Sequence, residues 1–445
     1  MDLIAHYRSL IDADLEGHRS RIAGFQQSCI DAQCQYANRP FVKVMRPKFL
    51  YESEYRNLDY VSSVLMGVFR RICDMVYHRK DLQEYVGMTE PELNLLRPEP
   101  LCPDPCAFTR LDSFQTANGP RFVELNGECP AGAGFSDRAM ECFLKLPLLQ
   151  QFMAETGVRP LPTRGGVLSG LLKVWSAVGR TRRPQILITD YQDIATVHEF
   201  HILAEWFRSH GYPTIVEDPR NLTFQNGRLI AQGTPIDLVY RRVLTNEFLE
   251  READVQALWR AYETQSIVMV NPFRAKPAHK KTCFALLSGD YLGQDWLTGE
   301  ERAVIQRTIP WTRKVREGNT TYCDREVDLL PFVLDNKDRF VLKPSDEYGG
   351  RGVIIGWETD TAAFGQLLAE ALKTPHVVQE RIPTTPEPFP HLEQGLDDQM
   401  MIVDLDPYIY LGQVQGVLAR LAAGSLCNVT SGGGQVPVFL APDPA

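Results

Sequence analysis

The sequence lacks the features that mark membrane, secreted and nucleic-acid-binding proteins. Its 445 residues contain no run of 18 apolar side chains, so no transmembrane helix is predicted. The opening segment has acidic residues and no apolar core, unlike a secretory signal peptide. Lys and Arg number 47 against 56 Asp and Glu, and this net charge of −9 argues against a nucleic-acid partner. We therefore expect a soluble cytoplasmic protein without nucleic-acid or membrane partners.

Cysteine is also scarce, with ten residues at irregular spacing, which is too few for a disulfide scaffold. The pair Cys102 and Cys106 has no second pair and no neighbouring histidine, so a four-ligand zinc site is not expected there. Most of the cysteines are predicted to be small buried hydrophobic residues.

The composition that is present, 44% hydrophobic and 23% charged, is typical of a globular protein with a large core. Helical periodicity covers 1–36 and 52–80, and a helix is expected over about 138–155. Over 183–245 the pattern runs strand, helix, strand, hairpin, strand, which predicts an open sheet of α/β type. No internal repeat or low-complexity linker separates the segments, so the two halves are expected to interlock.

A glycine-rich loop between two predicted strands, in VLKPSDEYGGRGVIIG (341–356), is typical of a phosphate-binding loop. Gly349, Gly350 and Gly352 let backbone N–H groups approach an anion closely, and Lys343 adds a positive charge. The strand–loop–strand order excludes a P-loop. The alternative is a glycine-rich hairpin with an incidental lysine.

The segment HVVQERIP, about 35 residues later, could present its backbone to an adenine ring. Its candidate residues are Gln379, Glu380 and Ile382. An ordinary exposed strand terminus is the alternative.

Polar residues alternate along a second predicted strand, RFVELN (121–126). Glu124 and Asn126 are two apart, so their side chains share a face, and Asp112 on the preceding strand could join them. Such oxygen ligands suit Mg²⁺, and Arg110 on the same face could contact a phosphate. The alternative is a solvated polar edge.

Three further arginines are candidate anion ligands. Arg420 lies among apolar residues of a predicted strand, so it needs an anionic partner, either a phosphate or a structural acid such as Asp404. The loop after it, with Asn428 and glycines 432–434, could approach a ligand. Arg241 and Arg242 could recognise a substrate carboxylate or form a salt-bridged surface pair.

These motifs resemble the circularly permuted ATP-grasp family, and in particular the synthetase domain of glutathionylspermidine synthase. The resemblance rests on an Arg-x-Asp pair, Arg110 and Asp112, followed by Glu-x-Asn and then by Pro130, all upstream of the lysine and glycine loop. It covers roughly 100–165 and 265–440, and 183–245 resembles the pre-ATP-grasp unit. Two departures from the family pattern are noted. No amidase region is recognised before the synthetase-like part, so no hydrolytic activity is expected. The loop sequence YGGRG leaves the substrate open but not the nucleotide.

The resemblance implies an α/β (α+β) ATP-grasp fold in permuted order, divided into four parts. These are a helical N-terminal region (1–105), a permuted segment with metal-binding strands (106–165), a pre-ATP-grasp α/β subdomain (166–265) and a nucleotide-binding region (266–445).

The resemblance also implies an ADP-forming carbon–nitrogen ligase that uses ATP and Mg²⁺ to join a small-molecule carboxylate to an amine. Asp112, Glu124 and Asn126 would bind the metal, and Arg110 and Arg420 would be catalytic. Lys343 and one lysine among 276, 280 and 281, with Lys281 preferred, would bind phosphates under a lid of residues 348–352 that includes Tyr348. A kinase of a small molecule and a nucleotide-binding scaffold without turnover are the alternatives.

Overall fold

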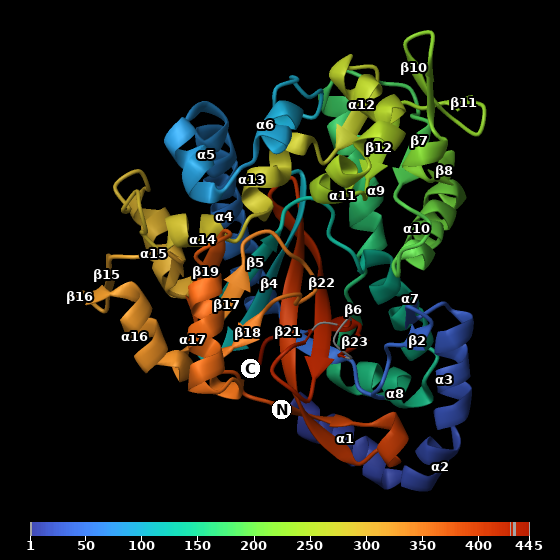
Figure 1. The fold of residues 1–445 in the computed structure, drawn as a ribbon. Helices are drawn as coiled ribbons and strands as arrows, with labels where there is room; N and C mark the ends of the chain where they lie inside the picture. Colours follow the sequence, from blue (N-terminus) through green and yellow to red (C-terminus); the bar gives the residue numbers. More distant parts are fainter. Residues whose placement is uncertain (1, 428, 430–432, 445) are drawn as a thin grey trace.

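The computed structural model describes residues 2–427, 429 and 433–444, and its centre is an antiparallel sheet with strand order β23-β22-β21-β4-β5 (Figure 1). A sixth strand, β20, pairs with β21. The sheet joins strands from the first third of the chain to strands near its end. The bounds are β4 Phe108–Thr116, β5 Gly119–Asn126, β20 Glu387–Pro390, β21 Asp398–Tyr410, β22 Gln413–Ala422 and β23 Gly434–Val436.

A second antiparallel sheet, β14-β19-β17-β18, carries the glycine-rich loop between β17 and β18. The helices α16 (Leu329–Asp335) and α17 (Thr361–Glu370) bury Val333 and Phe364 against it. A small hairpin, β15 with β16, lies beside this unit. The strand bounds are β14 Thr312–Lys314, β15 Asn319–Tyr322, β16 Arg325–Asp328, β17 Phe340–Pro344, β18 Ile354–Ile355 and β19 His376–Glu380.

A third sheet is fully parallel, in the order β13-β12-β7-β8. Its strand β7 (Ile186–Thr189) is buried on both faces because helices cover the two sides, as is usual for parallel sheets. The other bounds are α9 Arg164–Ala177, α10 Val197–Ser209, β8 Thr214–Glu217, β9 Thr223–Gln225, β10 Arg228–Ala231, β11 Thr234–Pro235, β12 Leu238–Arg241, α11 Thr245–Glu250, α12 Gln256–Glu263 and β13 Val268–Val270.

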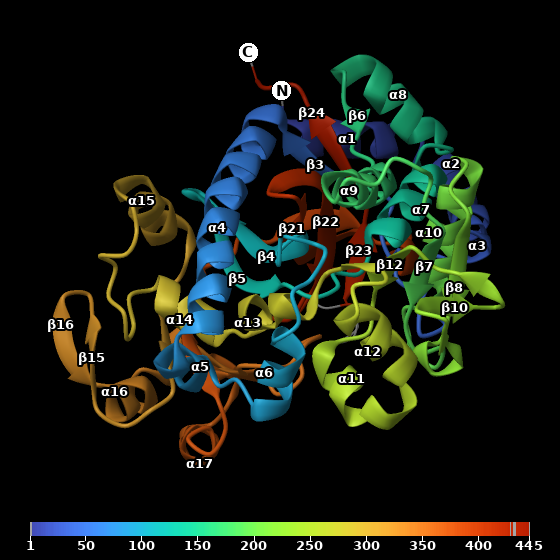
Figure 2. The same cartoon turned by 90° about the horizontal axis from the view of Figure 1, so that it is seen from above.

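The long helix α4 (Glu52–His78) runs along the central sheet (Figure 2). Its first turn is stabilised because the Glu54 carboxylate accepts the Tyr51 N–H at 2.8 Å. Apolar residues such as Leu58 and Leu65, spaced by three and four, form its buried face. Other bounds are α1 Leu3–Ala13, α2 Leu15–Ser20, α3 Ile22–Asp31, α5 Lys80–Val86, α6 Glu90–Leu96, α7 Ala133–Phe143, α8 Pro147–Thr156, α13 Lys276–His279, α14 Thr282–Leu287 and α15 Gly299–Thr308.

The two ends of the described chain meet in a small sheet, β3-β24-β6. Strand β24 (Val438–Ala441) lies between β3 (Lys48–Tyr51) and β6 (Arg159–Pro160). The N-terminal region and the last strands are therefore packed together, as expected for interlocked halves.

Most elements expected from the sequence are confirmed, including the parallel strands and the hairpin after β8. The helix expected over about 138–155 is wrong as a single element: α7 begins at Ala133, after Gly132 with φ of 105°, and ends at Phe143, and α8 begins at Pro147. Lys276 lies at the start of α13, and Lys280 and Lys281 connect it to α14.

All ten cysteines lie in the described part of the chain and are free thiols, and each is buried except Cys129 and Cys323. None of the described helices combines the length and the apolar character needed to cross a membrane.

Replacement of the fully buried Leu65 by alanine is expected to destabilise the protein by about 2–5 kcal/mol, because it leaves a cavity between α4 and the sheet. Denaturant unfolding measures this change. The exposed Ser63→Ala on the same helix is the control, and equal stability of the two variants would contradict the packing described.

Candidate active site

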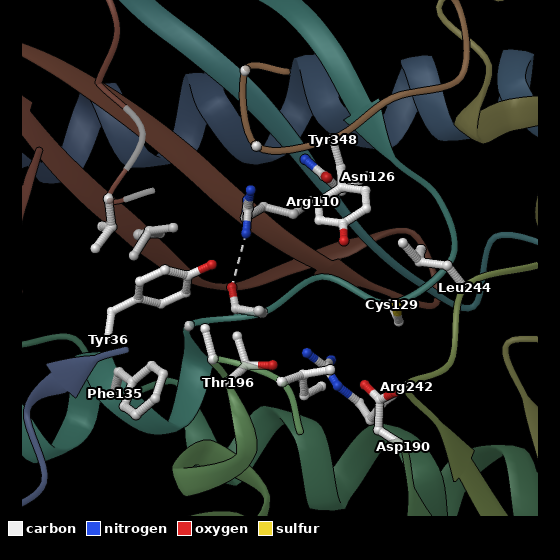
Figure 3. Close-up of a pocket in the computed structure, with 18 of the residues that line it drawn as sticks. Tyr36, Arg110, Asn126, Cys129, Phe135, Asp190, Thr196, Arg242, Leu244 and Tyr348 are labelled. Atoms are coloured by element: carbon white, nitrogen blue, oxygen red, sulfur yellow. Dashed lines mark hydrogen bonds between the residues drawn. The ribbon is translucent and has the colours of Figure 1, made fainter. Parts of the chain in front are cut away.

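A cavity of about 740 Å³ lies where the central sheet, the glycine-rich loop and the end of the parallel sheet meet (Figure 3). Its walls combine charged, polar and aromatic side chains from segments far apart in the sequence. The sheet contributes Arg110, Glu124, Asn126 and Arg420; the glycine loop contributes Tyr348, Gly349, Gly350 and Arg351; the parallel-sheet unit contributes Asp190, Thr196, Arg242 and Glu247.

Strand pairing explains why the residues of the central sheet share one face. In β4 and β5, Asp112 lies opposite Glu124 and Arg110 lies opposite Asn126. Directly opposed residues point to the same side of an antiparallel pair. The expected grouping of these four side chains is therefore present.

Asp112 is held by three donors. Its Oδ1 accepts hydrogen bonds from Arg110 Nε at 2.8 Å and from the Asn126 amide at 2.9 Å, and its Oδ2 lies 2.8 Å from Arg420 Nη2. Burial alone would raise the pKa of Asp112, but Arg110 and Arg420 outweigh it and hold the pKa well below its usual range. Asp112 is thus a permanently ionised carboxylate.

Arg420 lies between carboxylates on neighbouring strands. Its Nη2 is 2.7 Å from Asp404 and 2.8 Å from Asp406, in addition to its contact with Asp112. The structural acid considered from the sequence, Asp404, is therefore a partner of Arg420, which also lines the cavity. Burial raises the pKa of both Asp404 and Asp406, the nearby Asp112 carboxylate adds to this shift, and Arg420 opposes it.

Two buried lysines approach the Glu124 end of the cavity. Lys281 Nζ is 3.3 Å from Glu124 Oε2, and Lys343 Nζ donates to the Gln379 side chain at 2.8 Å. Burial lowers the pKa of Lys343 to about 8, while the nearby charge of Glu124 opposes this shift. Lys343 is therefore mostly charged at neutral pH and titrates just above it.

Lys276 and Lys280 have a different role from Lys281. Lys276 Nζ is 2.6 Å from Asp346 Oδ1, and Lys280 Nζ is 2.9 Å from Asp346 Oδ2. Lys276 also contacts Glu128 at 3.5 Å, and Lys280 contacts Glu92 at 2.9 Å. These lysines anchor the start of the glycine loop to the helix α6 and to the loop that follows β5.

The glycine loop crosses to the parallel-sheet unit. Gly349, Gly350 and Gly352 have φ of 65°, 79° and 67°, a region that favours glycine. The Tyr348 hydroxyl donates to Glu247 Oε1 at 3.3 Å, on the first turn of α11. The loop therefore lies over the cavity.

The expected adenine segment lies outside the residues that line the cavity. The Gln379 side chain is buried and holds Lys343, and it donates to Thr312 at 3.1 Å. The Glu380 N–H donates to the carbonyl of Trp311 at 2.8 Å, and Ile382 follows the end of β19. An adenine contact here stays a prediction.

The paired arginines at the end of β12 point in opposite directions. Arg241 is fully buried and contacts Glu128 at 3.4 Å, whereas Arg242 lines the cavity and donates to the Pro130 carbonyl at 2.6 Å. The surface salt-bridged pair considered from the sequence is excluded, because both side chains are buried.

Several cavity residues were missed by the sequence analysis. Asp190 follows the parallel strand β7, and burial raises its pKa to about 7 while Arg242 opposes the shift. His279 lines the cavity, and its Nδ1 is buried without a hydrogen-bond partner. Only the position of Asp190 after a buried parallel strand could have identified it.

Two further observations concern residues that the sequence predicts to bind a ligand or a metal ion. Asn428 and Gly432 lie outside the described residues. No cluster of three or more His, Cys, Asp or Glu side chains suited to a metal occurs among the residues that the structure describes.

Asp346→Asn should destabilise the protein by about 3 kcal/mol, since two buried lysines lose their shared carboxylate. The control is Asp338→Asn, whose side chain is 70% exposed and which should change stability by less than about 0.5 kcal/mol. Denaturant unfolding of both variants tests the anchor, and equal midpoints would contradict it.

Known proteins are similar to this chain in part of its sequence and in its fold. No family model matches the chain. A protein of Frankia casuarinae (strain DSM 45818 / CECT 9043 / HFP020203 / CcI3) described as "Putative glutamate–cysteine ligase 2-2" is 28% identical over 219 residues. That match spans 46% of this chain but only 25% of the relative's length.

Two solved structures are also similar. The apo form of a glutathione synthetase-like effector, GSS30 from Globodera pallida, matches with a TM-score of 0.58 and 13% identity over 94% of this chain and 97% of its own. The ATP-grasp ligase PsnB, complexed with minimal precursor, Mg and ADP, matches with a TM-score of 0.29 and 15% identity over 57% of this chain and 88% of its own. The chain has a mixed α/β fold that is similar to that of the glutathione synthetase-like effector.

Proposed function

We propose that the protein is an ATP-dependent ligase that joins a carboxylate to an amine through an acyl phosphate and releases ADP and phosphate. The observation that carries this proposal is the cavity itself, where oxygen donors and arginines line the wall and two buried lysines lie beside Glu124. The glutathione synthetase-like fold and the relative described as a glutamate–cysteine ligase support the same reaction class.

A circularly permuted order of segments is part of the proposal. Lys343 and Val123 are 220 residues apart in the sequence, yet Lys343 Nζ is 3.4 Å from the Val123 carbonyl. The strands proposed to bind the metal would thus precede the proposed nucleotide lysine in the chain and lie against it in space. The proposal keeps the four-part division at residues 105, 165 and 265.

Lys281 and Lys343 would bind the phosphates of ATP, with the glycine loop 348–352 above them. Both lysines lie near Glu124, and the loop lines the same cavity. Residues Gln379, Glu380 and Ile382 would contact the adenine through their backbone. Tyr348 would hold the loop closed through Glu247 and keep water from the acyl phosphate.

Mg²⁺ fits the oxygen donors at this end of the cavity. Glu124 and Asn126 both line the wall and present carboxylate and amide oxygens, which Mg²⁺ prefers. Asp112 would complete the set when Arg110 and Arg420 turn from it toward phosphate. Bound with ATP, the ion would neutralise charge on the transferring phosphoryl group.

Negative charge would develop near Arg110 and Arg420 during the proposed reaction. A carboxylate oxygen of the acid attacks the γ-phosphorus, and the bond from that phosphorus to the bridging oxygen of ADP breaks. The amine nitrogen then bonds to the acyl carbon as phosphate leaves and the amine loses a proton. Arg110 and Arg420 would stabilise the negative charge of both steps, since they line the cavity next to Glu124 and Asn126.

Calorimetric binding of Mg–AMPPNP tests the nucleotide site. Lys343→Ala should weaken binding at least tenfold, because a buried cation beside the phosphates is lost. The double variant Glu124→Ala/Asn126→Ala should lose the magnesium-dependent part of the affinity. The exposed Lys373→Ala is the control. Absence of nucleotide binding by the wild type would refute the proposal.

The pKa of about 8 for Lys343 predicts a pH dependence of nucleotide binding. The side chain is charged below this value, so affinity for Mg–ADP should fall about tenfold between pH 7 and 9 as the proton is lost. Lys343→Arg keeps its charge over this range and should bind with little pH dependence. Identical pH profiles for wild type and variant would contradict the assigned role.

A further inference from the structure

One end of the cavity is lined mostly by apolar and aromatic side chains, although burial raises the pKa of Tyr36 there and the nearby Arg351 guanidinium opposes that shift. Tyr36, Phe41, Phe135 and Leu418 line it, and the last three are at most 3% exposed. In Figure 3, Tyr36 and Phe135 lie at the opposite end of the cavity from Tyr348 and Leu244. The proposed chemistry at Glu124 and the lysines makes no use of this wall.

The wall is built by a short hairpin of the N-terminal region. Strands β1 (Gln35–Tyr36) and β2 (Arg39–Pro40) are joined by Ala37 and Asn38, whose φ values of 48° and 62° form a tight two-residue turn. The half-buried Tyr36, next to the turn, lines the cavity. The hairpin thus supplies an aromatic ring that packs against the core on one side and borders the cavity.

The hairpin is fixed to the rest of the site. The Phe41 N–H donates to the Cys34 carbonyl at 3.3 Å, and the Gln435 N–H donates to the Phe41 carbonyl at 3.0 Å. The Phe41 and Phe135 rings pack edge to face with centroids 5.5 Å apart. The wall is therefore preformed, which favours binding because little order has to be created.

The apolar wall begins close to Arg420, at the charged end of the cavity. Leu418 and Arg420 are two residues apart on β22, so their side chains share a face about 7 Å apart along the strand. If the carboxylate of a substrate lay near Arg420, the next few carbon atoms of that substrate would therefore reach Leu418. An apolar group at that distance gains free energy by leaving water, whereas a charged group would lose its hydration there.

We propose that the acid activated in this cavity carries an apolar or aromatic group, which binds against Tyr36, Phe41, Phe135 and Leu418. This inference rests on the proposed function, because it assigns the substrate carboxylate to the arginine end. Tyr36 is then a specificity-determining residue supplied by the N-terminal region.

Calorimetry of the full chain with three probe acids tests this inference. The probes are 3-phenylpropanoate, propanoate and glutarate, which present an aromatic group, a short chain and a second charge to the wall. Each is titrated with and without saturating Mg–AMPPNP into the wild type, Tyr36→Ala, Tyr36→Phe and the exposed control Tyr291→Ala.

We expect 3-phenylpropanoate to bind at least tenfold more tightly than propanoate and glutarate. Tyr36→Ala should lose most of this preference, while Tyr36→Phe and Tyr291→Ala keep it. Absence of 3-phenylpropanoate binding, equal or tighter binding of glutarate, or an unchanged preference in Tyr36→Ala would each overturn the inference. Binding of Mg–AMPPNP in the same samples reports separately on the proposed function.

Discussion

The Nη2 atom of Arg420 lies within 2.8 Å of carboxylate oxygens from Asp112, Asp404 and Asp406, on two strands of the central sheet. Unpaired charges of this kind are costly to bury, so each group depends on the others for its place in the core. The strands β4, β21 and β22 are therefore held in one register, with Arg110, Glu124 and Asn126 on the same face. Loss of Arg420 would leave Arg110 to balance the charge of the three buried carboxylates.

A second charged cluster ties the glycine loop to the rest of the molecule. Asp346, next to β17, accepts from Lys276 and Lys280, and these lysines reach Glu128 and Glu92. These contacts connect a loop of the last third of the chain to a helix before residue 100 and to the loop that follows β5. The cavity therefore forms only when all these segments have folded together. This requirement accounts for the way in which the two halves of the chain interlock.

Local periodicity was sufficient to predict part of the site. A period of two placed Glu124 and Asn126 on one face, and the glycines at 349, 350 and 352 lie in a loop between two paired strands, as predicted. The buried run ILIT predicted the parallel strand β7, which the structure confirms. The mixed α/β fold implied by the family resemblance is also confirmed.

Long-range packing determined what could not be predicted. Lys276, Lys280 and Lys281 are close in sequence, and only the fold directs Lys281 to Glu124 and the other two to Asp346. Arg420, one of the partners of Asp112, lies on β22 and is 308 residues away in the sequence. Tyr36 reaches the cavity through a hairpin that has no local signature of binding.

Mass spectrometry of the reaction products would test the central claim, that a carboxylate and an amine are joined here at the expense of ATP. The protein is incubated with Mg–ATP and a mixed pool of small acids and amines. The account predicts ADP, phosphate and a new compound whose mass equals one acid plus one amine minus water. Formation of ADP without any condensed product, or of AMP in its place, would contradict it.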